Sequence, residues 1–185
     1  MEELAALVVR SRSGDLDAYA EIVRRFQDMA YGYAFSLLGD FHLAEDASQE
    51  AFLQAHRDLA KLRVPAAFPG WFRKIVLKHC DRIARGKRRT IQSLKAAAEE
   101  LSKEPTPADR AEQDELHKAV LAAIRSLPER ERNVTTLFYI DGYSQLDIAG
   151  FLDMPVTTVN DRLHASRKRP RHSQGERVRA ELWLR

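Results

Sequence analysis

The sequence contains one cysteine, Cys80, among its 185 residues, and its six histidines are scattered along the chain. A single cysteine excludes an intrachain disulfide. A zinc site would need its ligands at short, recurring spacings. His79 and Cys80 are adjacent instead, so in a helix their side chains would point in different directions. We therefore expect neither a metal site nor a cofactor.

Long apolar runs are also missing. No stretch approaches the roughly 18 residues that a membrane-spanning helix needs. The first residues, MEELAALVVRSRSGD, are acidic at their start and lack the basic and then apolar organisation of a signal peptide. We expect a cytoplasmic protein without a membrane-inserted segment.

Motifs of catalysis are missing as well. The sequence has no glycine-rich phosphate loop, no GxSxG and no HExxH. The carboxylate pairs Glu45–Asp46 and Glu99–Glu100 are sequence neighbours, which favours solvated side chains over a general acid and base. We expect that the protein is not an enzyme.

Charge of both signs is present but unevenly distributed. Residues 1–60 carry 5 basic and 11 acidic side chains, whereas residues 61–95 carry 11 basic side chains and 1 acidic one. Residues 96–150 carry 6 and 11, and residues 151–185 carry 8 and 4. Two separate basic surfaces could neutralise phosphates. Because charge runs are usually solvated faces, the charge pattern alone leaves nucleic-acid binding and a plain surface as alternatives.

The first ninety residues have the periodicity of three amphipathic helices. The first follows Gly14, with Asp15 or Asp17 as its N-cap, and ends at Gly39. The second runs from about residue 42 to 62. The third runs from about residue 70 to 85, after the segment VPAAFP, whose two prolines exclude a regular helix.

The third predicted helix has a basic face beside aromatic residues. Its cations recur at spacings of three and four residues: Lys74, Lys78, Arg82 and Arg85. Phe68, Trp71 and Phe72 adjoin them, and aromatic rings next to cations suit unpaired bases. Phe72 is better explained as a core residue. For Phe68 and Trp71, a core role and a base-stacking role stay open.

A second helical group follows a weakly patterned segment. The run KAAAEELSKEPTPADRAEQ is small, polar and proline-bearing, which predicts an interdomain linker over residues 90–111. We predict an all-α fold of two small helical domains joined by a flexible linker. The domains are residues 1–89 and residues 112–170, and residues 171–185 form a tail of unknown order.

The segment from Ser144 to Arg169 has the form of a helix-turn-helix. Ser144 can cap a short helix, QLDIAGFL, and Asp153 begins a tight turn. The last helix would place three apolar residues inward and polar donors outward, as insertion into a major groove requires. The inward residues are Val156, Val159 and Leu163. The alternative is a helical hairpin in an ordinary bundle, which the adjacent cations of residues 167–169 disfavour.

Four blocks of the sequence, in this order, resemble bacterial RNA polymerase sigma factors of the extracytoplasmic-function type. The blocks are GDLDAYAEIVRRF, GDFHLAEDASQEAFLQAHRDL, FPGWFRKIVLKHCDRIARGKRR and LPERERNVTTLFYIDGYSQLDIAGFLDMPVTTVNDRLHASRKR. The resemblance covers roughly residues 5–169. It implies a promoter-specificity subunit that binds core RNA polymerase, recognises the minus-thirty-five and minus-ten promoter elements and promotes transcription initiation.

The resemblance implies three binding surfaces, in a region 2-like domain over residues 1–89 and a region 4-like domain over residues 112–170. Contacts to the polymerase clamp helices would come from Asp46, Gln49, Glu50 and Leu53. Contacts to the single-stranded minus-ten element would come from Phe68, Trp71, Arg73, Lys74, Lys78, Arg82 and Arg85. Contacts to the minus-thirty-five duplex would come from Thr158, Asn160, Arg162, Arg167 and Lys168.

Further partners follow from the resemblance alone. The LPERER segment would help to dock the second domain on the polymerase flap. An anti-sigma protein is another candidate partner, although no residue of this sequence indicates one. Three departures from the family stand out: Asn160–Asp161 where lysine or serine is frequent, Asp153 where glycine is frequent, and Pro170 inside the last helix.

Two other functions fit the residues. One is a stand-alone helix-turn-helix regulator that binds duplex operators without polymerase. The other is an interaction module that only sequesters a polymerase surface. Transcription with sigma-free core polymerase would separate the three functions.

Overall fold

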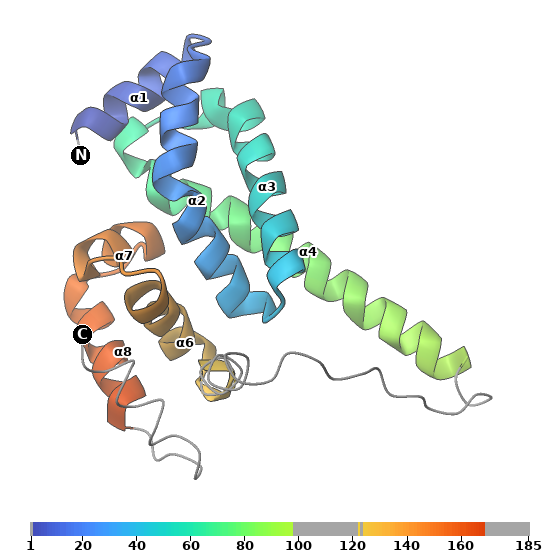
Figure 1. The fold of residues 1–185 in the computed structure, drawn as a ribbon. Helices are drawn as coiled ribbons and strands as arrows, with labels where there is room; N and C mark the ends of the chain where they lie inside the picture. Colours follow the sequence, from blue (N-terminus) through green and yellow to red (C-terminus); the bar gives the residue numbers. More distant parts are fainter. Residues whose placement is uncertain (1, 98–121, 123, 169–185) are drawn as a thin grey trace, which may run out of the picture.

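A computed structural model describes residues 2–97, 122 and 124–168, and Figure 1 shows their arrangement as helices only. In chain order the elements are α1 (Glu2–Arg12), α2 (Leu16–Leu38), α3 (Phe41–Asp58), the 3-10 turns η1 (Leu59–Lys61) and η2 (Pro65–Ala67), α4 (Phe68–Ala97), α6 (Glu129–Thr135), the π-helical turn η4 (Thr136–Ile140), α7 (Gln145–Leu152) and α8 (Val156–Lys168). The predicted all-α class with two helical groups is confirmed.

The N-cap of α2 is the predicted Asp15, whereas the N-cap of α3, Asp40, was not predicted. The Asp15 carboxylate accepts a hydrogen bond from the Ala18 N–H at 2.9 Å, and α2 ends at Gly39, whose φ of 65° favours glycine. The Asp40 carboxylate accepts from the Leu43 N–H at 3.2 Å and begins α3. These local hydrogen bonds satisfy N–H groups that a helix start leaves unpaired.

Two boundaries differ from the sequence-based prediction. Helix α1 was not expected; it forms because Leu7 and Val8 are buried on its inner side, against the rest of the N-terminal group. Helix α4 begins at Phe68, with Pro69 in its first turn, and continues to Ala97, past the predicted start of the linker at residue 90. The extension TIQSLKAA contains good helix formers and no glycine or proline. The remainder of the predicted linker and the predicted tail lie outside the described residues.

The core of the N-terminal group is built from aromatic rings and small residues. The ring of Phe68 stacks on Phe72 with centroids 5.5 Å apart, and Phe26 meets Phe68 edge-on at 5.3 Å. Helix α3 contributes alanines that have no exposed surface and that let it approach α2 closely: Ala44, Ala47, Ala51 and Ala55. Helix α2 contributes Ile22, Phe26, Met29 and Ala30, which are all buried.

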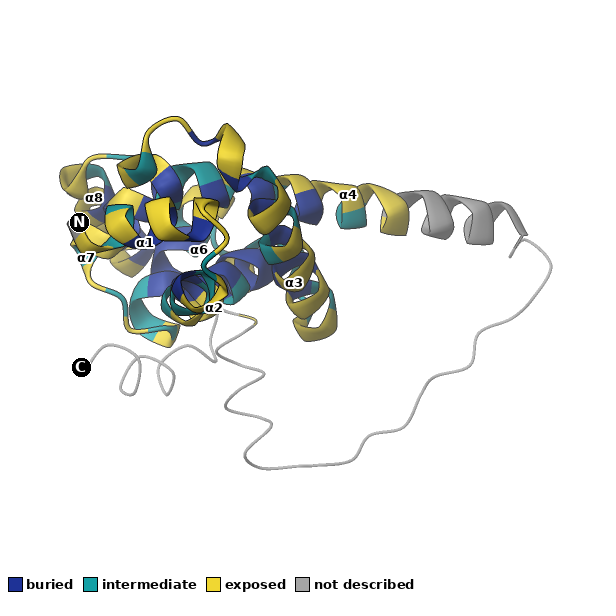
Figure 2. Ribbon diagram, turned by 90° about the horizontal axis from the view of Figure 1, so that it is seen from above, coloured by how far each residue is buried: buried dark blue, intermediate teal, exposed yellow. Residues whose placement is uncertain are grey.

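The C-terminal helices enclose a smaller core, which is continuous with the first. Its fully or almost fully buried side chains are Val134, Leu137, Ile148, Phe151, Val159 and Leu163. The α6–η4 segment packs against α2, and α7 packs against α4. In Figure 2, α4 extends away from both groups. No helix within the described ranges is long and apolar enough to cross a bilayer, and no cluster of histidine, cysteine and carboxylate side chains there could hold a metal ion.

Candidate nucleic-acid interface

The predicted helix-turn-helix is formed by α7, a short turn and α8. The Ser144 hydroxyl accepts a hydrogen bond from the Asp147 N–H at 3.2 Å and so caps α7, and it donates to the Asp147 carboxylate at 2.5 Å. The turn begins at Asp153, whose φ of 57° lies in the left-handed region. Aspartate is one of the few residues other than glycine that adopt this region readily, so the departure from the family's frequent glycine leaves the turn intact.

Helix α8 presents most of its predicted contact residues to solvent. Asn160, Arg167 and Lys168 are exposed, and Thr158 and Arg162 are half-buried. Val159 and Leu163 hold the opposite face in the core, as predicted. The inward prediction for Val156 is wrong: as the first residue of the helix it lies at the edge of the core and is 39% exposed.

Arg167 is oriented by a ring from η4. Its Nε donates to the Tyr139 hydroxyl at 2.7 Å, and its guanidinium carbon lies 5.7 Å from the centroid of the Tyr139 ring. A cation over an aromatic face is attracted by the ring's electron density. The last turn of α8 therefore holds one cation in a fixed direction.

The basic face of α4 lies in the open. Lys74, Lys78, Arg82 and Arg85 are all exposed, as the spacing predicted, and Asp81 is the only carboxylate on the whole helix. Arg73 differs from them because it is half-buried, and its Nε has no hydrogen-bond partner among the described residues. The exposed row is suited to neutralising several phosphates at once.

The aromatic residues beside this face have different surroundings. Phe68 has no exposed surface, since its ring lies among Phe26, Trp71 and Phe72. In this structure it cannot stack on a base, and its burial argues against the base-contact prediction. Trp71 is half-buried and packs against the edge of the core. Of the two residues left open by the sequence, Trp71 alone is accessible to a base.

The predicted polymerase-binding residues share one exposed side of α3. Asp46, Gln49, Glu50 and Leu53 are all exposed, and Leu53 shows 57% of its surface. A carboxylate-rich face that also displays a leucine suits a protein partner better than DNA, because carboxylates repel phosphates.

A chain of hydrogen bonds links this side of α3 to the basic face of α4, and sequence reasoning missed it. The guanidinium of Arg82 lies 3.1 Å from His79 Nδ1, and His79 Nε2 lies 2.8 Å from the Gln54 side-chain oxygen. Because arginine can only donate, Nδ1 accepts and Nε2 carries the proton that it donates to Gln54. Burial, together with the Arg82 charge, lowers the pKa of His79, which agrees with a neutral ring.

The same chain ends close to a residue predicted to bind polymerase. Arg82 also lies 3.9 Å from the Glu50 carboxylate, across two exposed side chains. An exposed pair at this distance contributes little to stability. The pair shows instead that a residue predicted to contact polymerase, Glu50, lies next to a residue predicted to contact DNA, Arg82. The spacing between Gln54 and His79 on two different helices gave no signal of this in the sequence.

Comparisons with known proteins relate these surfaces to a family. The family model described as Sigma-70 region 2 matches residues 22–90, and the model described as Sigma-70, region 4, matches residues 117–169. The chain is 31% identical over 166 residues to the ECF RNA polymerase sigma factor SigW of Bacillus subtilis, covering 85% of this chain and 89% of that protein. It is also 31% identical over 173 residues to the ECF RNA polymerase sigma-E factor of Escherichia coli K12, covering 88% and 89%.

Two solved structures share the fold. CnrH, in its complex with the cytosolic domain of CnrY, gives a TM-score of 0.61 at 22% identity, over 89% of this chain and 92% of that one. RpoE of Bartonella quintana, in complex with the anti-sigma factor NepR, gives 0.55 at 18% identity, over 90% and 97%.

Proposed function

We propose a partner for each of three surfaces of this chain, which belongs to the extracytoplasmic-function sigma factors of bacterial RNA polymerase. It is a promoter-specificity subunit, which works with core RNA polymerase and promoter DNA. The stand-alone regulator is not favoured, because both the region 2 and the region 4 family models match in the family's order.

The exposed side of α3 is the proposed contact to the polymerase clamp helices. Asp46, Gln49 and Glu50 surround the exposed Leu53, so a partner could bury the leucine while it pairs with the polar groups. Protein interfaces commonly combine an apolar centre with a polar rim. Nucleic acid fits this side poorly because of its carboxylates.

The basic face of α4 is the proposed contact to the minus-ten strand, and its row of exposed cations is the observation that carries the proposal. Lys74, Lys78, Arg82 and Arg85 would follow the backbone, while Trp71 would stack on a base. Phe68 then acts indirectly, by holding the first turn of α4 in the core. Arg73 is included with the cations, although its guanidinium is half-buried.

Helix α8 is the proposed reader of the minus-thirty-five duplex. Asn160 and Arg162 can donate to base edges, while Lys168 suits phosphates. Thr158 and Arg167 complete the surface, and Arg167 is already oriented by Tyr139. We further propose that the chain catalyses no reaction itself, acts in the cytoplasm and is bound by an anti-sigma protein when inactive. The anti-sigma proposal is supported by the structural neighbour RpoE, which was solved in complex with the anti-sigma factor NepR.

Transcription in vitro with sigma-free core polymerase tests the function as a whole. Promoter-specific RNA that appears only when the protein is added is the expected result. Binding of the protein alone to a duplex, with no effect on initiation, would instead support a separate regulator. Inhibition without initiation would support an interaction module.

The polymerase contact is tested by Asp46→Arg combined with Gln49→Ala. Charge reversal and loss of the amide should weaken association with core polymerase in a pull-down, since both side chains lie on the exposed side of α3. A matched control is Asp17→Arg with Gln27→Ala, which changes the same residue types at exposed positions of α2. Equal retention of the two double variants would remove α3 from the contact.

A further inference from the structure

Three polar residues of α3 form a row on the side of the helix that meets α4. Glu50, Gln54 and Asp58 recur every four residues, so they lie on one line along the helix. His79 of α4 meets the middle of this row, with its Nε2 2.8 Å from the Gln54 side-chain oxygen. The ring is only 5% exposed, and a buried polar ring is costly unless partners match its nitrogens. The partners of His79 therefore bear on what the ring does.

Hydrogen bonds extend from His79 in both directions and form one chain. Lys61 Nζ donates to one carboxylate oxygen of Asp58 at 2.6 Å, and Gln54 Nε2 donates to the other at 3.1 Å. The Gln54 oxygen meets the His79 ring, and the other ring nitrogen meets Arg82 at 3.1 Å. The chain thus runs from η1, along α3, to the basic face of α4.

Both ends of this chain require the same direction of donation. The hydrogen bond from Lys61, and then that from Gln54, lower the pKa of Asp58, so its carboxylate is ionised and can only accept. The guanidinium of Arg82 can only donate. An amide and a neutral imidazole can each be turned either way, but one order alone satisfies every contact. The Gln54 amide donates to Asp58 and accepts from His79 Nε2, which leaves Nδ1 as an acceptor.

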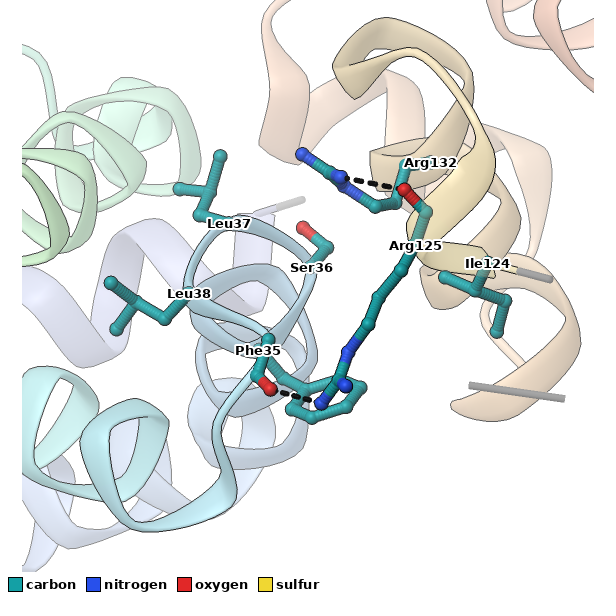
Figure 3. Close-up of a pocket in the computed structure, with 8 residues that line it drawn as sticks. Phe35, Ser36, Leu37, Leu38, Ile124, Arg125 and Arg132 are labelled. Carbon is teal, nitrogen blue, oxygen red and sulfur yellow. Dashed lines mark hydrogen bonds between the residues drawn. The ribbon is translucent and has the colours of Figure 1, made fainter. Parts of the chain in front are cut away.

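The bond from Arg82 to an imidazole differs from the bonds of two arginines elsewhere in the molecule. At the end of α2, Arg125 donates to the Gly39 carbonyl, and Arg132 donates to the Arg125 carbonyl at 3.3 Å, beside a pocket of about 300 Å³ (Figure 3). A carbonyl oxygen always accepts. An imidazole nitrogen accepts only in one of the two neutral tautomers. The hold on Arg82 therefore depends on residues that do not touch it.

Arg82 has a second and weaker neighbour. The Glu50 carboxylate lies 3.9 Å from its guanidinium, and the two side chains are 48% and 63% exposed. Glu50 belongs to the proposed polymerase contact, so polymerase would compete with Arg82 for it. The bond to the buried His79 ring lies outside that contact and would persist in the holoenzyme. His79 is thus the neighbour that can direct Arg82 while DNA is bound.

We propose that His79 is a positioning residue, held in one tautomer by Gln54 and Asp58, which aims the guanidinium of Arg82 at the minus-ten strand. The inference rests on the proposed function, because it takes Arg82 as a contact to that strand. A long exposed side chain loses rotamer freedom when it binds, and holding it beforehand reduces this cost. For one side chain the gain is about two- to tenfold in affinity.

Two substitutions of His79 separate the two sides of its ring. An asparagine oxygen can take the place of Nδ1, whereas a glutamine amide reaches as far as Nε2. His79→Asn therefore keeps an acceptor for Arg82, and His79→Gln loses it. Binding of the minus-ten strand by the holoenzyme should weaken about two- to tenfold in His79→Gln and less in His79→Asn. His42→Gln, at an exposed position of α3, is the matched control and should bind as the unsubstituted protein does. Equal losses in the two His79 variants would overturn the proposal.

A double-mutant cycle with Arg82→Ala distinguishes positioning from a structural tie between α3 and α4. If His79 acts through Arg82, His79→Gln should cause no further loss of binding in the Arg82→Ala protein. A structural tie would weaken binding equally in both backgrounds, together with a lower resistance to denaturant, and would overturn the positioning role. If Arg82→Ala binds the strand normally, Arg82 is no contact and the inference fails with it.

The tautomer of His79 is measured in the free protein by the nitrogen-15 chemical shifts of the ring. Nε2 should carry the proton, and this should not change in Arg82→Ala, because Gln54 still accepts from it. Adding Gln54→Met, which keeps the length of the side chain, should let the second tautomer appear. A proton on Nδ1 in the unsubstituted protein, or a change with Arg82→Ala alone, would overturn the chain. The measurement needs neither polymerase nor DNA, so it is separate from the proposed function, which fails if the holoenzyme binds no promoter strand.

Discussion

Helices α4 and α8 both present cations to the proposed DNA, but the surroundings of those cations differ. On α4, Lys74 and Lys78 are exposed in a stretch with a single carboxylate. On α8, Arg167 is held by Tyr139, and Asp161 lies among the donors. Exposed cations with few carboxylates nearby suit phosphates, whereas donors held in one direction suit base edges. The comparison suggests that α4 supplies affinity and α8 supplies sequence reading.

The largest effect should be the loss of folding stability when the buried residue that holds α4 or α8 in its core is truncated. Phe68→Ala should destabilise the N-terminal group by about 3–5 kcal/mol, and Leu163→Ala should destabilise the C-terminal group by about 2–5 kcal/mol, because each leaves a cavity in a core. Denaturant unfolding followed by circular dichroism measures both. Lys74→Ala is the control and should stay within about 0.5 kcal/mol. A Phe68→Ala value as small as the control would mean that Phe68 leaves the core in solution.

The affinity of α4 should depend strongly on salt. Lys74→Ala with Lys78→Ala should reduce the salt dependence of minus-ten strand binding by the holoenzyme, by about 1.4 in log Kd per log salt concentration for a single strand. Arg12→Ala with Arg24→Ala removes two exposed cations from α1 and α2 and should leave it unchanged. Titrations at several salt concentrations give the slopes. Identical slopes in the two double variants would contradict the assignment of α4.

The loss on α8 should depend on sequence. Arg162→Ala should weaken minus-thirty-five binding by about 1–3 kcal/mol. Binding to a set of single-base promoter variants distinguishes the mechanisms: a loss confined to one base pair indicates base reading, and a uniform loss indicates a phosphate contact. A uniform loss would remove the proposed contrast between α8 and α4, and no loss would place Arg162 outside the contact.

The smallest effect is a dependence on pH of the packing between the N-terminal and C-terminal helical groups. Where the residue after η4 lies against α2, burial and then Asp28 raise the pKa of Asp141 to about 7. The packed arrangement of the two helical groups therefore holds this proton more tightly than an arrangement in which the groups are apart and the carboxyl has an ordinary pKa of about 4. Packing of the two groups is most favourable at acidic pH, weakens as pH rises between these two values, and levels off above about 7.

Fluorescence energy transfer between one fluorophore on each helical group measures this change and should decrease as the pH rises. Three titratable groups interact with Asp141: Asp28 and Tyr31 on α2, and Tyr143, which follows Asp141 by two residues. The two tyrosines titrate far above this range, because burial raises their pKa values. Asp141→Asn should abolish the pH response. A response of the opposite sign, or one that survives the substitution, would show that Asp141 does not control the packing of the two groups.

Helix positions were largely predictable from the sequence because their signals are local. Asp15 and Ser144 cap helices as expected, since a capping side chain bonds to N–H groups two or three residues away. The exposed row on α4 follows from its spacing alone. Helix α1 escaped prediction because its short apolar side becomes clear only once it lies on the rest of the group.

Contacts between distant residues were not predictable. The sequence left a core role and a base-stacking role open for Phe68, and three other aromatic rings enclose it. The segment YGYAFSLL of α2 is apolar around its whole circumference, which signals burial on two sides. Nothing in that pattern says which residues cover the second side. Asn133 is separated from its partner Ser36 by 97 positions.

Helix α4 is unbroken to Ala97, so its length fixes where the chain leaves the helix and in which direction. From Gly86 to Ala97 the helix adds about 18 Å, at 1.5 Å for each residue. Each inserted or deleted residue would turn the exit of the chain by about 100° and shift it by that same rise. A two-residue insertion would direct the exit to nearly the opposite side, whereas a seven-residue insertion would restore the direction about 10 Å farther out. The helix thus sets both the position and the direction of the chain at Ala97.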